Sequence, residues 1–152
     1  MIRLEAKKIS IDNVTKEPVL ILEDEKSKKS MDVLINTLEL PWFISFFYNI
    51  PQENNTVFHF INSLTKSFFF KLKKIILFKE ERHFSGRLIF SFFFLKKVQT
   101  LNVSDAMLLA VATGTPIFIE ESYLERKKSS DISPEALFLR NWEPNKHNAP
   151  IN

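Results

Sequence analysis

Apolar residues within 101–121 recur at the spacings of a helix followed by a strand. The first half is apolar on nearly every side, which predicts a helix buried around most of its circumference. Asn102 suits the N-cap, and Asp105, three residues later, suits both the cap backbone and the positive helix end. Gly114 suits the left-handed position after the helix, and residues 117–119 then predict a short core strand. We expect the rest of the chain to pack around this stretch.

The amino-terminal third alternates between apolar and polar residues, which predicts β-strands. The expected strands are 1–12, 18–24 and 31–36, the first two forming a hairpin. A change of phase near Lys7 and Lys8 predicts a β-bulge in the first strand. Residues 23–30 are charged and without periodicity, which predicts a solvated loop.

Helical spacing follows in the next segment. Asn36 with Glu39 three residues on resembles a helix start and predicts a helix over 36–49. A second helix is expected from about Thr56, with His59 on its polar face. Its predicted buried face consists of Val57, Ile61, Leu64 and Phe68.

Three further strands and a C-terminal extension complete the prediction. The strands are 69–78, 84–94 and 95–101. In the second of them Phe84, Leu88, Phe90, Phe92 and Phe94 share one face, which is expected to be core. After Glu121 a short helix is expected, and Ser133 before Pro134 predicts a small helix through Trp142, followed by a poorly ordered tail. We therefore expect one domain over 1–128 and an extension over 129–152.

Composition narrows the class of protein. A chain of 152 residues is long enough for one core. The absence of cysteine excludes disulfides and thiolate metal sites and suits a cytoplasmic location. No apolar run reaches the roughly 18 residues of a membrane span, so no membrane partner is expected. Sixteen phenylalanines beside two glycines predict a large aromatic core and a homo-oligomer interface.

One motif carries a resemblance to a known family. The sequence SDAMLLAVATGTPIFIEESYLE, residues 104–125, resembles the signature of the bifunctional nuclease domain family. That family usually reads Arg-Pro-Ser-Asp-Ala, an apolar helix, a small-residue turn, Pro-Ile-Phe/Tyr-Val and a Glu-rich exit. Ser104, Asp105, Ala106, Gly114, Pro116, Ile117 and Phe118 match it in order. The order of the elements agrees with the family from about Ile2 to Glu125.

The resemblance implies a fold and a reaction. The fold is a single α+β domain with a mixed, strongly bent sheet packed by about three helices. The activity is hydrolysis of DNA or RNA phosphodiester bonds, assisted by a divalent metal, Mg²⁺ or Mn²⁺. The matching motif positions carry over four candidate catalytic residues, Glu39, His59, Ser104 and Asp105. Glu39 and Asp105 are the candidate metal ligands.

Two departures from the family pattern keep other functions open. Asn102 stands where the family has arginine, and Phe60 where it has an acid beside the histidine. These losses suit a non-catalytic scaffold or regulatory homo-oligomeric module, and a small-molecule sensor is a third possibility. Ser104, Asp105 and Glu39 also suit plain helix starts, and His59 also suits a solvated histidine. The net charge is +3, and the clustered lysines fit either a phosphate-contacting patch or a charged outer sheet face. They are Lys71, Lys73, Lys74, Lys96 and Lys97.

Overall fold

The protein is described by a computed structural model in which residues 1–51, 57–66 and 70–126 are placed. Its helices are α1 (Leu40–Phe47), α2 (Val57–Lys66) and α3 (Val103–Thr113), with a short 3₁₀ turn, η1 (Glu121–Tyr123). Its strands are β1 (Ile2–Ile11), β2 (Pro18–Glu23), β3 (Lys29–Leu34), β4 (Phe70–Glu80), β5 (His83–Phe92), β6 (Leu95–Asn102), β7 (Ile117–Ile119) and β8 (Glu125–Arg126).

All strands join in one sheet in the order β6-β5-β4-β7-β1-β2-β3-β8. The β4–β7 pair is parallel and the other pairs are antiparallel, so the sheet is mixed as expected. β1 links the two halves, because Ile2–Leu4 pair with β7 whereas Glu5–Ile11 pair with β2. The predicted bulge in β1 is confirmed by a register shift between Ala6 and Lys8. The α+β class of a single-sheet domain is thereby confirmed.

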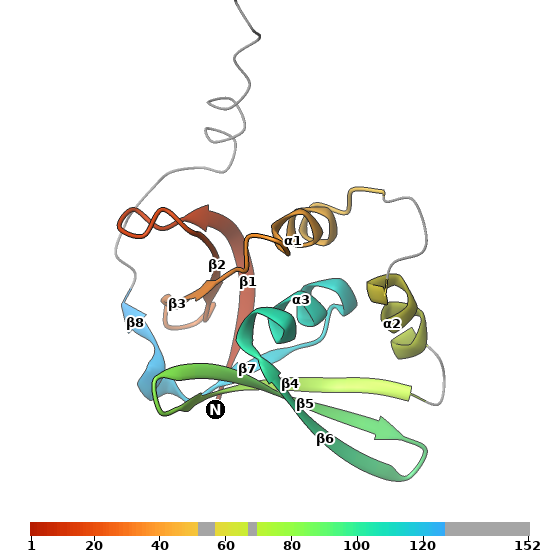
Figure 1. Cartoon of the computed structure of the whole chain (residues 1–152). Coiled ribbons are helices and arrows are strands. Elements are labelled where there is room, and N and C mark those ends of the chain that lie inside the picture. Colours follow the sequence, from red (N-terminus) through yellow and green to blue (C-terminus); the bar gives the residue numbers. More distant parts are fainter. Residues whose placement is uncertain (52–56, 67–69, 127–152) are drawn as a thin grey trace, which may run out of the picture.

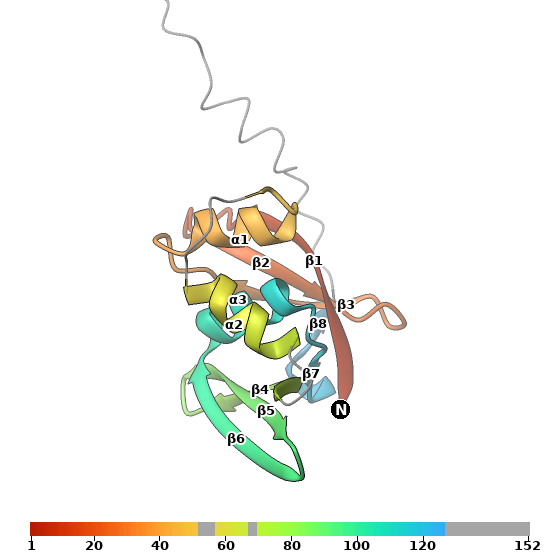
Figure 2. The same ribbon diagram turned by 90° about the vertical axis from the view of Figure 1, so that its right-hand side faces the viewer.

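Helix α3 lies inside the bend of the sheet and contacts strands of both halves, β3 on one side and β4, β5 and β6 on the other (Figure 1). Its residues Ala106–Ala110 are buried, as the nearly all-round apolar pattern predicts. Turned by 90°, α1 lies over the half formed by β1 and β2, and α2 lies beside α3 over the other half (Figure 2). The face of β4–β6 opposite the helices carries no described helix.

The close approach of α3 to β5 depends on Gly86. A Cβ built on Gly86 would lie 2.2 Å from the Cβ of Ala106, far inside van der Waals contact. The other glycine, Gly114, ends α3 with φ at 65°, and its N–H donates to the carbonyl of Ala110. Close packing therefore requires glycine at position 86, and the left-handed backbone favours glycine at position 114.

Several predicted element boundaries are wrong. The first helix starts at Leu40 instead of residue 36, because Asn36 forms a turn in which its Oδ1 accepts from the N–H of Leu38 at 3.1 Å. β3 begins at Lys29, inside the predicted loop 23–30. The expected helix after Glu121 is the single turn η1, followed by β8, which pairs with Lys29 and Ser30 of β3.

Two burial predictions are also wrong. Phe92 and Phe94 are exposed, because β5 ends at Phe92 and the alternation of a strand does not continue through the turn. On α2, Val57 and Leu64 are exposed, although they belong to the predicted buried face. Phe68 and the predicted C-terminal helix from Ser133 to Trp142 lie outside the described residues. In the placed part of the chain no helix is long and apolar enough to cross a membrane.

Candidate functional site

The candidate site lies where the start of α3 faces the start of α1. Asn102 caps α3, as predicted, with its Oδ1 accepting from the N–H of Asp105 at 2.9 Å. The Nδ2 of Asn102 donates to Oδ2 of Asp105 at 2.5 Å. Asp105 thus bonds the side chain of the cap residue instead of its backbone N–H, which corrects the expected capping-box geometry. The result is a carboxylate held in a fixed orientation at the positive end of α3.

Glu39 comes to the same place from a segment more than sixty residues earlier in the chain. It is the N-cap residue of α1, yet its side chain forms no capping hydrogen bond. Its backbone is held instead, because its N–H donates to the carbonyl of Asn36 at 2.8 Å and its own carbonyl accepts from Trp42 and Phe43. The carboxyl group is therefore available to another element.

Ser104 joins the two segments. Its Oγ donates to Oε2 of Glu39 and accepts from the N–H of Asn36 at 3.2 Å. One hydroxyl therefore uses both its donor and an acceptor position to tie the loop before α1 to the first turn of α3. Glu39, Ser104 and Asp105 form what we call the carboxylate cluster.

Burial and the neighbouring Asp105 alter the pKa of Glu39. Burial raises the pKa of Glu39 above its ordinary value of 4.5, and a hydrogen bond to the carboxyl of Asp105 and the negative charge of that residue raise it further. The hydroxyl of Ser104 acts in the opposite direction. A carboxyl pair of this kind is stabilised either by a shared proton or by a cation.

His59, the fourth candidate residue, and its neighbour Phe60 both lie on α2. The side chain of His59 lies outside the described residues. Phe60, which replaces the family's acid, is exposed to solvent on α2. Of the four candidate residues, the fold therefore brings together Glu39, Ser104 and Asp105.

The cluster is small for a metal site. Among the placed residues no group of three or more acidic, histidine or cysteine side chains gathers as metal ligands would. Mg²⁺, however, is commonly held by one or two carboxylates, with waters and substrate phosphates completing its shell. Two facing carboxyl groups with a raised pKa at Glu39 fit that type of ligation.

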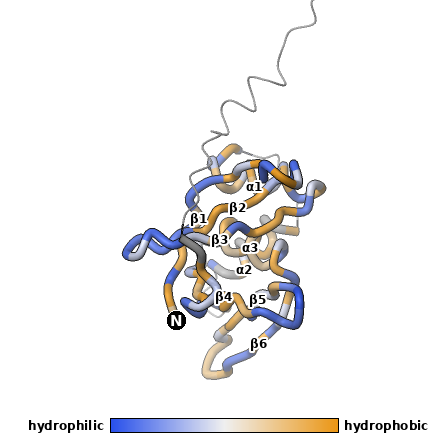
Figure 3. Tube along the Cα trace, turned by 90° about the vertical axis from the view of Figure 1, so that its left-hand side faces the viewer, coloured by the Kyte–Doolittle hydropathy of each residue, from blue (hydrophilic) through white to orange (hydrophobic). Residues whose placement is uncertain are grey.

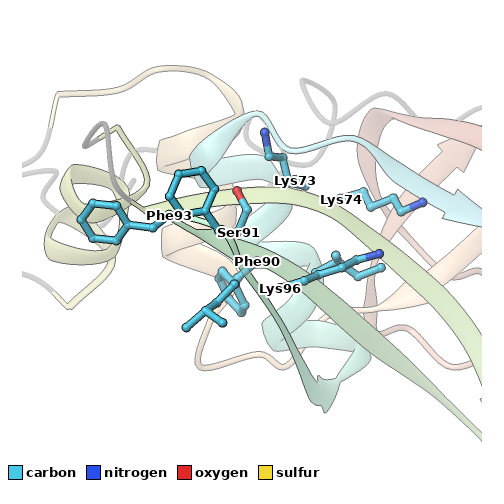
Figure 4. Close-up of a pocket in the computed structure, with 9 residues that line it drawn as sticks. Lys73, Lys74, Phe90, Ser91, Phe93 and Lys96 are labelled. Atoms are coloured by element: carbon cyan, nitrogen blue, oxygen red, sulfur yellow. The ribbon is translucent and has the colours of Figure 1, made fainter.

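A second feature lies at the far end of the β5–β6 hairpin. A pocket of about 320 Å³ opens there. Lys73, Lys74 and Lys96 lie on one side of it and Phe93 on the other, with Ser91 between the two sides (Figure 4). The lysines were part of the predicted patch, whereas the exposure of the neighbouring turn was missed. No turn signal marks this point in the sequence, because residues 92–97, Phe-Phe-Phe-Leu-Lys-Lys, contain no glycine.

Comparison with known proteins adds no relative. No protein-family model matches the chain, and no curated protein matches it in sequence. The resemblance to the bifunctional nuclease domain family therefore rests on the motif residues themselves.

Proposed function

We propose that the protein is a metal-assisted phosphodiesterase that acts on DNA or RNA, with the carboxylate cluster as its active site. The observation that carries the proposal is the meeting of Glu39 and Asp105 at the start of α3, with Ser104 bonded to Glu39. The motif resemblance supports the same positions. Helix dipole and backbone N–H groups at this end of α3 also favour a phosphate nearby.

In this proposal each residue has a separate task. Glu39 and Asp105 would hold Mg²⁺ or Mn²⁺, which supplies charge neutralisation for the phosphate and an activated water. Ser104 and Asn102 are positioning residues, because the first orients Glu39 and the second orients Asp105. With Mg²⁺ bound, Glu39 would be ionised despite its raised pKa, since the cation stabilises the charged form.

A second candidate is a non-catalytic scaffold or regulatory module that forms homo-oligomers. The observation in its favour is that both polar groups of the Asn102 side chain are used within the helix cap. Asn102 therefore does not replace a phosphate-binding arginine. On this reading Ser104 and Glu39 only fasten α1 to α3.

A nuclease assay distinguishes the two candidates. Labelled single- and double-stranded DNA and RNA are incubated with the protein in Mg²⁺, Mn²⁺ or chelator. The active-site proposal requires metal-dependent cleavage that falls at least a hundredfold in Glu39→Gln and Asp105→Asn. Glu17→Gln, at an exposed acid in the β1–β2 turn, is the matched control and should cleave like the wild type. Cleavage that survives in both cluster variants refutes the site, and absence of cleavage in every metal favours the scaffold.

A further inference from the structure

The β5–β6 hairpin ends in an apolar turn that lies outside the core. Phe94 is fully exposed, Leu95 is 71% exposed, and Phe92 and Phe93 are also exposed. The hairpin extends beyond the helices in both ribbon views (Figures 1 and 2). Hydropathy colouring is orange around its end, at the bottom of the molecule (Figure 3). We call Phe92–Leu95 the hairpin tip. Large contiguous apolar exposure of this kind marks an interaction surface.

The backbone of the hairpin tip supports a role for its aromatic residues. Two residues, Phe93 and Phe94, connect Phe92 of β5 to Leu95 of β6. Phe93 has φ at 51°, a conformation for which hairpin turns favour glycine, asparagine or aspartate. A phenylalanine at this position carries a conformational cost that the fold itself does not require. Function therefore offers a reason for an aromatic residue there.

Lysines surround the base of the hairpin tip. Lys71 and Lys96 pair across the sheet with the same residue, Ser91, one position from the end of β5. Lys97 pairs with Phe90 and so lies on the opposite face of the hairpin. These three lysines are exposed, and none of them forms an ion pair within the placed part of the chain.

The bulge in β4 brings two more lysines beside the hairpin. The register shifts between Leu72, opposite Phe90, and Lys74, opposite Ile89, so Lys73 is the extra residue. The shift places the consecutive Lys73 and Lys74 beside the same part of β5, where both line the pocket (Figure 4). Lys71, Lys73, Lys96 and Lys97 thus lie two to three residues from the turn, counted along the hairpin, on the order of 10 Å. Lys74, opposite Ile89, lies farther from the turn and is half-buried, with its Nζ 5.7 Å from the centre of the Phe118 ring of β7.

We propose that the hairpin tip inserts into an anionic lipid membrane, with the four exposed lysines, Lys71, Lys73, Lys96 and Lys97, contacting the lipid headgroups. Apolar side chains at the end of a protruding hairpin, with cations about one headgroup depth behind them, are complementary to the two layers of a lipid surface. No carboxylate lines the described pocket among these lysines. The hairpin would attach the protein to one side of the membrane without crossing it. This proposal departs from the expectation, drawn from the sequence, of no membrane partner.

Other occupants fit this surface less well. A second copy of the chain seated tip to tip would bring the lysines around the two hairpin tips together, and repulsion between like charges disfavours this arrangement. Single-stranded nucleic acid is bound by aromatic rings that lie on a sheet face beside the cations. Here the rings are concentrated at the end of the hairpin, and Phe94 is fully exposed beyond the last strand pair.

Vesicle co-sedimentation of the full chain tests the proposal. The wild type should pellet with phosphatidylcholine vesicles containing phosphatidylglycerol, and much less with phosphatidylcholine alone or at high salt. Leu95→Ser and Phe94→Ser should each weaken binding about tenfold. Leu38→Ser, at another leucine with 84% exposure, is the matched control and should bind normally. Exposed positions keep these variants folded, which thermal unfolding checks.

Charge is tested separately. Lys96→Glu should lower binding by roughly fivefold or more, from about 1 kcal/mol per basic residue near an anionic surface. Lys26→Glu, in the exposed β2–β3 turn, should not. Equal binding to neutral and anionic vesicles, or no binding to either, overturns the proposal. It is also overturned if Phe94→Ser instead abolishes binding to single-stranded oligonucleotides or dissociates a dimer while vesicle binding is unchanged.

Discussion

Gly86 of β5 lies directly against Ala106 of α3, with only 2.2 Å available between a Cβ at position 86 and the Cβ of Ala106. This contact sets how deeply α3 enters the bend of the sheet. It therefore also sets the position of Ser104 and Asp105, which lie one turn or less before Ala106 on the same helix. Packing at Gly86 and the geometry of the carboxylate cluster are coupled through α3.

Gly86→Ala should destabilise the protein by about 2–3 kcal/mol, because the added methyl group would overlap the Cβ of Ala106, which cannot move without the helix. Urea unfolding measures the loss. The double variant Gly86→Ala with Ala106→Gly restores the space, so its loss should be smaller than the sum of the two single losses. Additive losses, or a Gly86→Ala variant as stable as the wild type, would contradict the contact.

Gly114→Ala should cost about 1–2 kcal/mol for a different reason. A Cβ at this position meets nothing within 4 Å, so the cost comes from the left-handed backbone at φ 65°. Gly114→Asn should cost less, since asparagine tolerates this conformation. Thermal unfolding of the two variants compares them, and an alanine variant more stable than the asparagine variant would argue against a conformational origin.

Local signals made the central helix predictable. Asn102, Gly114 and the apolar run between them each act on their own neighbours, and all appear in the structure as expected. The meeting of Glu39 with Ser104 is non-local, because it depends on how the bent sheet brings α1 against α3. The motif resemblance indicated these residues as candidates, but the pattern of the sequence contains no physical reason for them to lie close together.

The hairpin tip was mispredicted because its sequence continues the alternation of a strand. Phe93 and Phe94 form a two-residue turn without the glycine or asparagine that usually marks one. The same pattern therefore placed Phe94 in the core, where the structure has it exposed. Strand β8 was missed because two residues are too few for any periodicity.

Asn102→Ala should destabilise the protein by about 1 kcal/mol, through loss of the bond that its Oδ1 accepts from Asp105 N–H. It also releases the carboxyl of Asp105 from the 2.5 Å bond with Nδ2. Asn102→Ser keeps a capping oxygen and loses Nδ2, so it should retain stability while leaving Asp105 less oriented. If the enzyme proposal holds, Asn102→Ser therefore lowers metal-dependent cleavage more than it lowers stability. If Asn102→Ala and Asn102→Ser lose the same amount of stability and the same amount of cleavage, the two roles of the Asn102 side chain are not separate, which would contradict the prediction.

The carboxylate cluster should make stability depend on pH in a predictable direction. Burial and Asp105 raise the folded-state pKa of Glu39 above 4.5, so the folded protein keeps a proton that the unfolded chain releases at lower pH. The stability linked to that proton is fully present below about pH 4.5 and is lost as the pH rises through the raised pKa.

Glu39→Gln removes this titration, because the amide stays neutral at every pH. The free energy of unfolding of Glu39→Gln, relative to the wild type, should therefore increase as the pH rises above 4.5 and then become constant. Urea unfolding at a series of pH values in metal-free buffer measures the difference, and Glu17→Gln serves as the exposed control. A difference that is independent of pH, or that falls as the pH rises, would show that Glu39 is not held in the folded protein as described, partly buried and facing Asp105. If the carboxylate cluster binds Mg²⁺ as proposed, added Mg²⁺ should reduce the effect, because a cation between the carboxyl groups stabilises the ionised form of Glu39.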